Sequence, residues 1–166
     1  MMEVTRTDGK KEETKSRYDQ LKKQITNDKE LTDKEREQLL SDLEKQNRLK
    51  RLKGKHIYLY FMQMGIDFYT GKRMKFDDVI NGIYDIDHII PQSMIKDDSL
   101  DNKVLVSKKY NQEVKKDIYP ICDEIKSKML DTWKGYYTRK LISEEKYNRL
   151  NSNEDITLDD LTEPTE

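Results

Sequence analysis

The chain has 166 residues, of which 34% are hydrophobic and 39% are charged, and its formal net charge is −1. So little apolar material favours a modest core with solvated helical extensions over one uniformly packed globule. No apolar run is long enough to span a membrane and no signal-peptide pattern is seen, so we expect no membrane association. A single cysteine, Cys122, excludes an internal disulfide. We therefore expect a cytoplasmic protein with a reduced, buried thiol.

Residues 1–54 predict an irregular start followed by two helices. Residues 1–15 are polar, and apolar residues at helical spacing predict a weak helix over residues 16–26. The second helix opens at Thr32, where Glu35 can complete a capping box, and Gly54 is its predicted end. Sustained heptads are missing, so the helices either pack lightly on a neighbour or form a partner-binding surface.

The most apolar run is "HIYLYFMQMG", residues 56–65, which fits either a strand or a buried helix. Its aromatic residues suit core packing, although stacking on nucleic-acid bases is an alternative. We interpret His56 as structural, because no acidic residue lies near it in sequence. The next segment, "DFYTGKRM", predicts a loop with a turn at Gly71.

Residues 82–116 read as strand, loop, strand, helix. A strand leads into "YDIDHIIPQS", a polar loop follows Pro91, "KVLV" forms a second strand, and Ser107 caps a helix through "KKYNQEVKK". Two amphipathic helices are predicted beyond, over residues 121–133 and 141–150, the latter capped by Ser143. The stretch from 151 to 166 carries six acids and no base, and we expect a mobile linker there.

The segment around His88 carries the candidate chemistry. On a strand, Asp85 and Asp87 project from one face, and one or two carboxylates can bind Mg²⁺. The neighbouring His88 could act as a general base that takes a proton from water. Strict alternation places Asp87 and His88 on opposite faces, so both can reach one phosphate only if the strand ends or twists here. Pro91 makes an ending reasonable.

By itself this motif fits a polar turn as well as a catalytic site. Asn102 lies 14 residues after His88, and Asn111 lies 23 residues after it, in the predicted helix. The histidine–asparagine–asparagine layout in "DIDHIIPQS", "DNKVLV" and "KKYN" resembles the HNH nuclease family. The stretch from His56 to Leu150 is similar to the HNH domain of the type II CRISPR effectors, which are RNA-guided DNA endonucleases.

This resemblance implies an α+β, mostly helical fold with a ββα-metal core of two short antiparallel strands and a helix. It also implies three parts: linker helices over residues 1–55 that join an RNase H-like lobe, a nuclease domain over 56–150, and an acidic linker over 151–166. The implied cofactor is Mg²⁺, for which Mn²⁺ can substitute.

The resemblance also assigns roles to individual residues. Asp87 and Asn111 would bind the metal, and His88 would be the general base. Asn102 would hold the loop between the strands, and Asp85 would support the site as a nearby carboxylate. A basic residue that contacts substrate follows the helix asparagine in this family, but Gln112 and Glu113 stand here, so that role falls to Lys115 or Lys116.

The implied activity is one-metal hydrolysis of the DNA strand that is paired with a guide RNA. The implied partners are that heteroduplex and the remaining lobes of a larger effector, with the domain itself a monomer and no membrane involved. A near-neutral module that a larger protein delivers to DNA needs little affinity of its own. A stand-alone HNH homing or restriction endonuclease and a non-catalytic helical interaction module are the alternatives.

Overall fold

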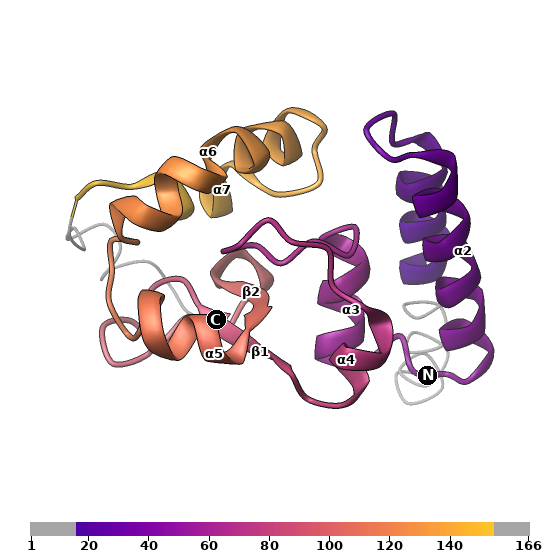
Figure 1. The fold of residues 1–166 in the computed structure, drawn as a ribbon, viewed down its shortest axis with the longest axis horizontal. Coiled ribbons are helices and arrows are strands. Elements are labelled where there is room, and N and C mark those ends of the chain that lie inside the picture. Colours follow the sequence, from indigo (N-terminus) through magenta and orange to yellow (C-terminus); the bar gives the residue numbers. More distant parts are fainter. Residues whose placement is uncertain (1–15, 155–166) are drawn as a thin grey trace, which may run out of the picture. The chain divides into compact units, whose positions relative to one another are not determined.

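The computed structural model describes residues 16–154, and the chain forms two compact units, Met1–Gly65 and Ile66–Glu166 (Figure 1). Residues 1–15 and 155–166, which include the predicted irregular start and most of the acidic linker, lie outside the described part. No helix within residues 16–154 is long and apolar enough to cross a membrane. The functional boundaries at residues 55 and 150 remain predictions, because the two units are defined by compactness alone.

The first unit contains a helix over residues 16–27, α2 (Asp33–Arg48) and α3 (Lys55–Met62). The predicted capping box is confirmed: the Glu35 amide donates to Thr32 Oγ1 over 3.1 Å, and the Thr32 amide donates to Glu35 Oε1 over 2.9 Å. The predicted end of α2 at Gly54 is wrong. The helix ends at Arg48, and Gly54 is instead the residue that precedes α3.

The apolar run at residues 56–65 is mainly helix rather than strand. In α3 the side chains of Leu59, Tyr60 and Phe61 are buried, and the Tyr60 and Phe61 rings meet edge to face at 5.1 Å. Core packing therefore explains these aromatic residues. His56 is exposed near the start of the same helix.

The second unit is built on a two-stranded antiparallel sheet, which confirms the predicted α+β class. Strand β1 (Tyr84–His88) pairs with β2 (Lys103–Ser107), and a short helix α5 (Lys108–Tyr110) continues as the π-helix η2 (Asn111–Lys115). Ser107 Oγ accepts from the Tyr110 amide over 3.2 Å, as predicted for the cap. The remaining elements are α4 (Phe76–Ile80), the 3₁₀-helix η1 (Leu100–Asn102), α6 (Asp123–Thr138) and α7 (Glu144–Asn151).

The strand register places Asp87 and His88 at the end of the sheet. Asp87 lies opposite Val104, and His88, the last residue of β1, lies opposite Lys103. The three central residues of β2 are fully buried, whereas β1 is mostly half-buried. The predicted strand ending is confirmed, because β1 stops at His88, three residues before Pro91.

A tight loop at residues 66–73 is hydrogen-bonded to β2. The Asp67 carboxylate accepts hydrogen bonds of 2.9 Å from the Tyr69 amide and, across the fold, from the Ser107 amide. Trp133 Nε1 donates to the Phe68 carbonyl over 3.0 Å. Gly71 has φ +75° and faces Met129 so closely that a Cβ would lie 3.2 Å from its sulfur. These contacts hold the loop rigidly and bury the Tyr69 side chain.

Helices α6 and α7 pack side by side (Figure 1). Both predicted helices are confirmed, and Ser143 Oγ accepts from the Lys146 amide over 3.0 Å. Cys122, the residue before α6, is half-buried, so the expectation of a buried thiol is wrong. Lys146 is buried, with its amine 5.8 Å from the centre of the Phe68 ring. Burial lowers the pKa of Lys146 to about 8, against an opposing effect of Asp101.

This buried amine predicts a pH-dependent stability. Below about pH 8 the folded state holds a charged Lys146 at a cost that the unfolded chain avoids, and the cost disappears as the pH rises toward 10.5. We expect Lys146→Met to raise the free energy of unfolding at pH 7 by about 1–3 kcal/mol. The gain should shrink between pH 8 and pH 10, as measured by urea denaturation.

Lys134→Met, at an exposed position of α6, is the matched control and should change stability little at any pH. A constant difference between wild type and Lys146→Met from pH 7 to pH 10 would contradict the assignment.

Candidate active site

The centre of the site is the carboxylate of Asp87, which is only 5% exposed. Its Oδ2 accepts a 2.7 Å hydrogen bond from the Tyr69 hydroxyl and lies 3.1 Å from Lys115 Nζ. Its Oδ1 accepts from Asn111 Nδ2 over 3.2 Å. A buried charge is tolerated only where it is paired and hydrogen-bonded, and here the loop that carries Tyr69 and the π-helix η2 supply those partners.

Tyr69 is a site residue that sequence reasoning missed. Burial raises the pKa of Tyr69 well above its ordinary value, and the charge of Asp87 and the hydrogen bond to it raise it further. The hydroxyl therefore stays neutral and remains a donor to Asp87. No motif spacing pointed to Tyr69, because it lies in a segment that predicted only a loop.

Asn111 lies where α5 passes into the π-helix η2, a type of helix that is frequent at functional sites. Its Nδ2 donates to Asp87, but its Oδ1 is buried and lacks a hydrogen-bond partner among residues 16–154. An unsatisfied buried amide oxygen is costly, so its presence beside a carboxylate indicates a position for a positively charged or donating group.

The structure places the two candidate substrate-binding lysines differently. Lys115 is buried, and its ammonium lies 3.1 Å from Asp87 Oδ2 and donates to the His88 carbonyl over 3.3 Å. Lys116 is exposed and has a left-handed backbone with φ 56°. In this arrangement only Lys116 presents its side chain to solvent, and contact of either lysine with substrate remains a prediction.

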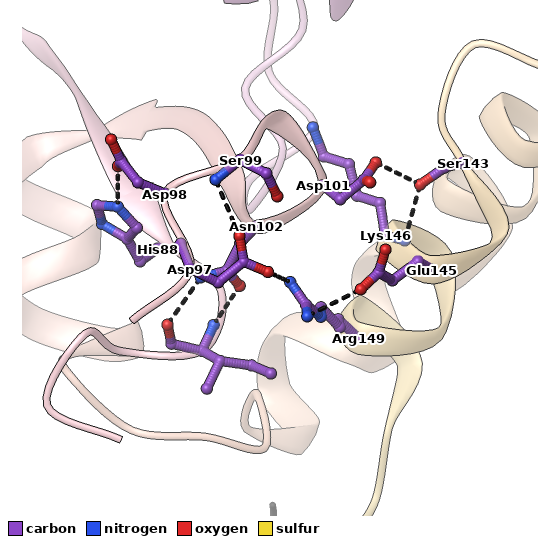
Figure 2. A network of polar contacts seen from close by, with 11 residues as sticks. His88, Asp97, Asp98, Ser99, Asp101, Asn102, Ser143, Glu145, Lys146 and Arg149 are labelled. Atoms are coloured by element: carbon purple, nitrogen blue, oxygen red, sulfur yellow. Dashed lines mark hydrogen bonds and ion pairs between the residues drawn. The ribbon is translucent and has the colours of Figure 1, made fainter. Parts of the chain in front are cut away.

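The imidazole of His88 has a different partner from the carboxylate of Asp87. Its Nε2 lies 2.8 Å from Asp98 Oδ1 (Figure 2). Lys103 Nζ lies 3.1 Å from the same oxygen. Asp85, two residues before Asp87, accepts a 2.9 Å hydrogen bond from the Ile86 amide and is half-buried. The structure thus joins Asp87 to Asn111, whereas the imidazole of His88 is directed to Asp98.

Asn102 is fully buried and joins two parts of the loop between the strands. Its Oδ1 accepts from the Ile90 amide over 2.9 Å, and its Nδ2 donates to the Ile90 and Asp97 carbonyls over 3.0 and 2.9 Å. The Ile89 amide also donates to the Asn102 carbonyl. These bonds fix the chain directly after His88.

The same loop is anchored to α7. Arg149 donates to Asp97 Oδ2 over 2.6 Å, and Ser143 Oγ donates to Asp101 Oδ1 over 2.6 Å (Figure 2). Burial alone would raise the pKa of Asp97, but the hydrogen bonds from Ser99 and Arg149 and the charge of Arg149 together hold it below its usual value. Asp97 is therefore ionised at neutral pH.

The donor set fits a hard divalent cation. Asp87 offers a carboxylate and Asn111 an unpartnered amide oxygen, and such cations take oxygen ligands, of which water and substrate phosphate can supply the remainder. The described residues contain no group of three or more histidine, cysteine or acidic side chains placed to hold a metal. The site therefore offers two protein ligands to a metal ion, Asp87 and Asn111.

The chain is similar to known proteins in the region of this site. Residues 67–121 match the family described as HNH endonuclease. The CRISPR-associated endonuclease Cas9 of Streptococcus mutans is 42% identical over 100 residues, and that of Listeria innocua is 41% identical over 99 residues. Each match covers 60% of this chain but only 7% of the relative.

A solved structure of Streptococcus thermophilus Cas9 in complex with the GGAA PAM also matches, with a TM-score of 0.53 and 32% identity. The match covers 64% of this chain and 11% of that one. The similarity therefore extends from sequence to fold, over a small part of a much larger protein.

The bonds of Asn102 predict a large structural cost for its removal. Asn102→Ala leaves the Ile90 amide and two carbonyls without partners, so we expect a loss of about 2–4 kcal/mol in the free energy of unfolding. Urea denaturation followed by circular dichroism measures it. Asn81→Ala, at an exposed position after α4, should cost far less, and equal effects of the two variants would refute this role for Asn102.

Proposed function

Because this chain carries an HNH endonuclease domain of the kind found in Cas9, we propose that it hydrolyses a phosphodiester bond of DNA by a one-metal mechanism. The observation that supports this most directly is the buried Asp87 carboxylate bonded to Asn111, whose own buried amide oxygen lacks a partner among residues 16–154, beside the end of the strand that carries His88. A carboxylate, an amide oxygen and an imidazole are the groups that such a reaction needs.

Asp87 and Asn111 would hold Mg²⁺, for which Mn²⁺ can substitute. When bound, the metal supplies positive charge that stabilises the phosphate and the leaving oxygen. Tyr69 keeps the Asp87 carboxylate in place by donating to Oδ2. The ammonium of Lys115 neutralises the same oxygen, so Lys115 and the divalent cation compete for Asp87.

His88 would act as the general base that takes a proton from the attacking water. An imidazole suits this step because it exchanges a proton near neutral pH. Its side chain is 22% exposed, which leaves it accessible to water. Asp85 supports the site as a nearby carboxylate, and the exposed Lys116 is better placed than Lys115 to contact a phosphate.

The proposed substrate is the DNA strand paired with a guide RNA, presented by the other lobes of a larger effector. The chain spans only 7% of the length of the Cas9 relatives that it matches, so most of such a protein would lie outside it. In RNA-guided nucleases base pairing reads the sequence, and docking of this domain permits cleavage. A net charge of −1 agrees with a module that other domains bring to DNA.

The decisive experiment places this chain in a complete guide-loaded effector and follows each DNA strand separately. We expect His88→Ala to reduce cleavage of the guide-paired strand by at least about 10²-fold and to spare the other strand. His56→Ala, which removes the only other histidine, should leave both strands cleaved. Normal cleavage by His88→Ala would overturn the proposed function.

The metal site can be tested without any activity. Titration of the chain with Mn²⁺ should broaden the NMR signals of Asp87, His88 and Asn111 before those of other residues, because paramagnetic broadening falls steeply with distance. Asp87→Asn should abolish this selective broadening, whereas Asp131→Asn on the exposed side of α6 should preserve it. Uniform, weak broadening would instead favour a non-catalytic helical module.

A further inference from the structure

The imidazole of His88 has a carboxylate partner that neither the motif nor the family match assigns. Asp98 lies ten residues further along the chain, in the loop between the strands, and its Oδ1 is 2.8 Å from His88 Nε2. A carboxylate can only accept hydrogen bonds, so Nε2 must carry a hydrogen in this contact. In neutral imidazole the other nitrogen, Nδ1, is then the acceptor.

Asp98 has a second charged neighbour. Lys103 Nζ lies 3.1 Å from the same Oδ1, and the lysine side chain is only 8% exposed. Lys103 is paired with His88 across the two strands, so the register of the sheet places its ammonium near the imidazole's partner. The attraction between this ammonium and Asp98 Oδ1 helps to hold the carboxylate oxygen beside the imidazole.

The position of Asp98 is fixed from both neighbouring residues. Asp97 accepts from Arg149 of α7 over 2.6 Å, and the Asp97 carbonyl accepts from the buried Asn102 over 2.9 Å. On the other side the Ser99 amide donates to Asp97 Oδ1 over 2.9 Å. Figure 2 shows these contacts surrounding the loop, with Asp98 directed to His88. A loop held in this way presents its carboxylate in one place.

We propose that Asp98 is a positioning residue that holds the imidazole of His88 through Nε2 and leaves Nδ1 as the nitrogen that takes the proton from water. This inference rests on the proposed function of His88 as general base. Asp98 itself would not touch the reacting atoms. A carboxylate in this position sets the tautomer of the imidazole and stabilises the charge that the imidazole acquires when it accepts the proton.

The tautomer can be measured directly, because the chain has only two histidines. In a long-range ¹H–¹⁵N spectrum in alkaline buffer, where both imidazoles are neutral, we expect His88 to show a protonated Nε2 and an unprotonated Nδ1. The same chain unfolded in urea serves as the reference for an unconstrained imidazole. A His88 ring with the hydrogen on Nδ1, or with the same mixture of tautomers as in the unfolded chain, would overturn the proposal.

A variant separates this contact from general folding. Asp98→Ala should shift the His88 nitrogens toward the mixture seen in the unfolded chain, while the amide signals of β1 and β2 remain dispersed. Asp131→Ala, which removes an exposed carboxylate from α6, should leave the His88 signals unchanged. Unchanged His88 nitrogens in Asp98→Ala would show that the contact does not set the tautomer, and the proposal would fail.

Cleavage of the guide-paired strand in the complete effector gives the second readout. Misplacement of a catalytic group by about 1 Å costs on the order of 10²-fold in rate, so we expect a loss of that size for Asp98→Ala and partial recovery for Asp98→Glu. If His88→Ala abolishes cleavage but Asp98→Ala does not reduce it, only the role of Asp98 fails. If His88→Ala cleaves normally, the proposed function fails, whatever the tautomer.

Discussion

The second unit is organised around one electrostatic constraint, the burial of the Asp87 carboxylate at the end of a two-stranded sheet. A carboxylate that is 5% exposed is stable only if its oxygens are paired and hydrogen-bonded. The partners are Tyr69, Asn111 and Lys115, which come from a loop before the sheet and from the π-helix after it. The packing of those two segments therefore brings all three partners to the side chain of Asp87.

Each partner depends on contacts of its own. Tyr69 is placed by the loop at residues 66–73. Asp67 bonds this loop to β2, and the indole of Trp133 in α6 donates to a backbone carbonyl of the loop. Asn111 is placed by a helix that begins at the Ser107 cap and widens into π geometry. Because Ser107 also donates its amide to Asp67, the loop and the helix share one residue at the end of β2. A change in either segment would therefore alter the hydrogen bonds of Asp87.

Alternation along a strand sets Asp87 and His88 apart, and the structure gives them separate surroundings. Asp87 is enclosed by the loop and helix described above, whereas His88 meets Asp98 in the loop between the strands. Lys115 links the two, since its ammonium contacts the Asp87 carboxylate and the His88 carbonyl. Helix α7 contributes from a distance, because Arg149 and Ser143 anchor the loop that carries Asp98.

Local sequence predicted most of the helices and strands of this protein and indicated the type of motif. The capping box at Thr32, the Ser107 and Ser143 caps, the two strands and the later helices are confirmed, because each depends on residues a few positions apart. The spacing of His88, Asn102 and Asn111 was enough to indicate an HNH site. Sequence patterns were weaker where a short apolar run allowed two structures, as at residues 56–65, and at the end of α2.

Only the tertiary structure decided which side chains meet. Tyr69 lies 18 residues from Asp87, Asp98 lies ten from His88, and Arg149 lies 52 from Asp97, and no local pattern encodes these contacts. The buried state of Lys115 and the unpartnered oxygen of Asn111 likewise emerge only when the loop, sheet and π-helix enclose them. Helix caps and the hydrogen bonds of a helix join residues that are near neighbours in sequence. The partners of a buried charge are instead the polar groups that folding brings within about 3 Å of it.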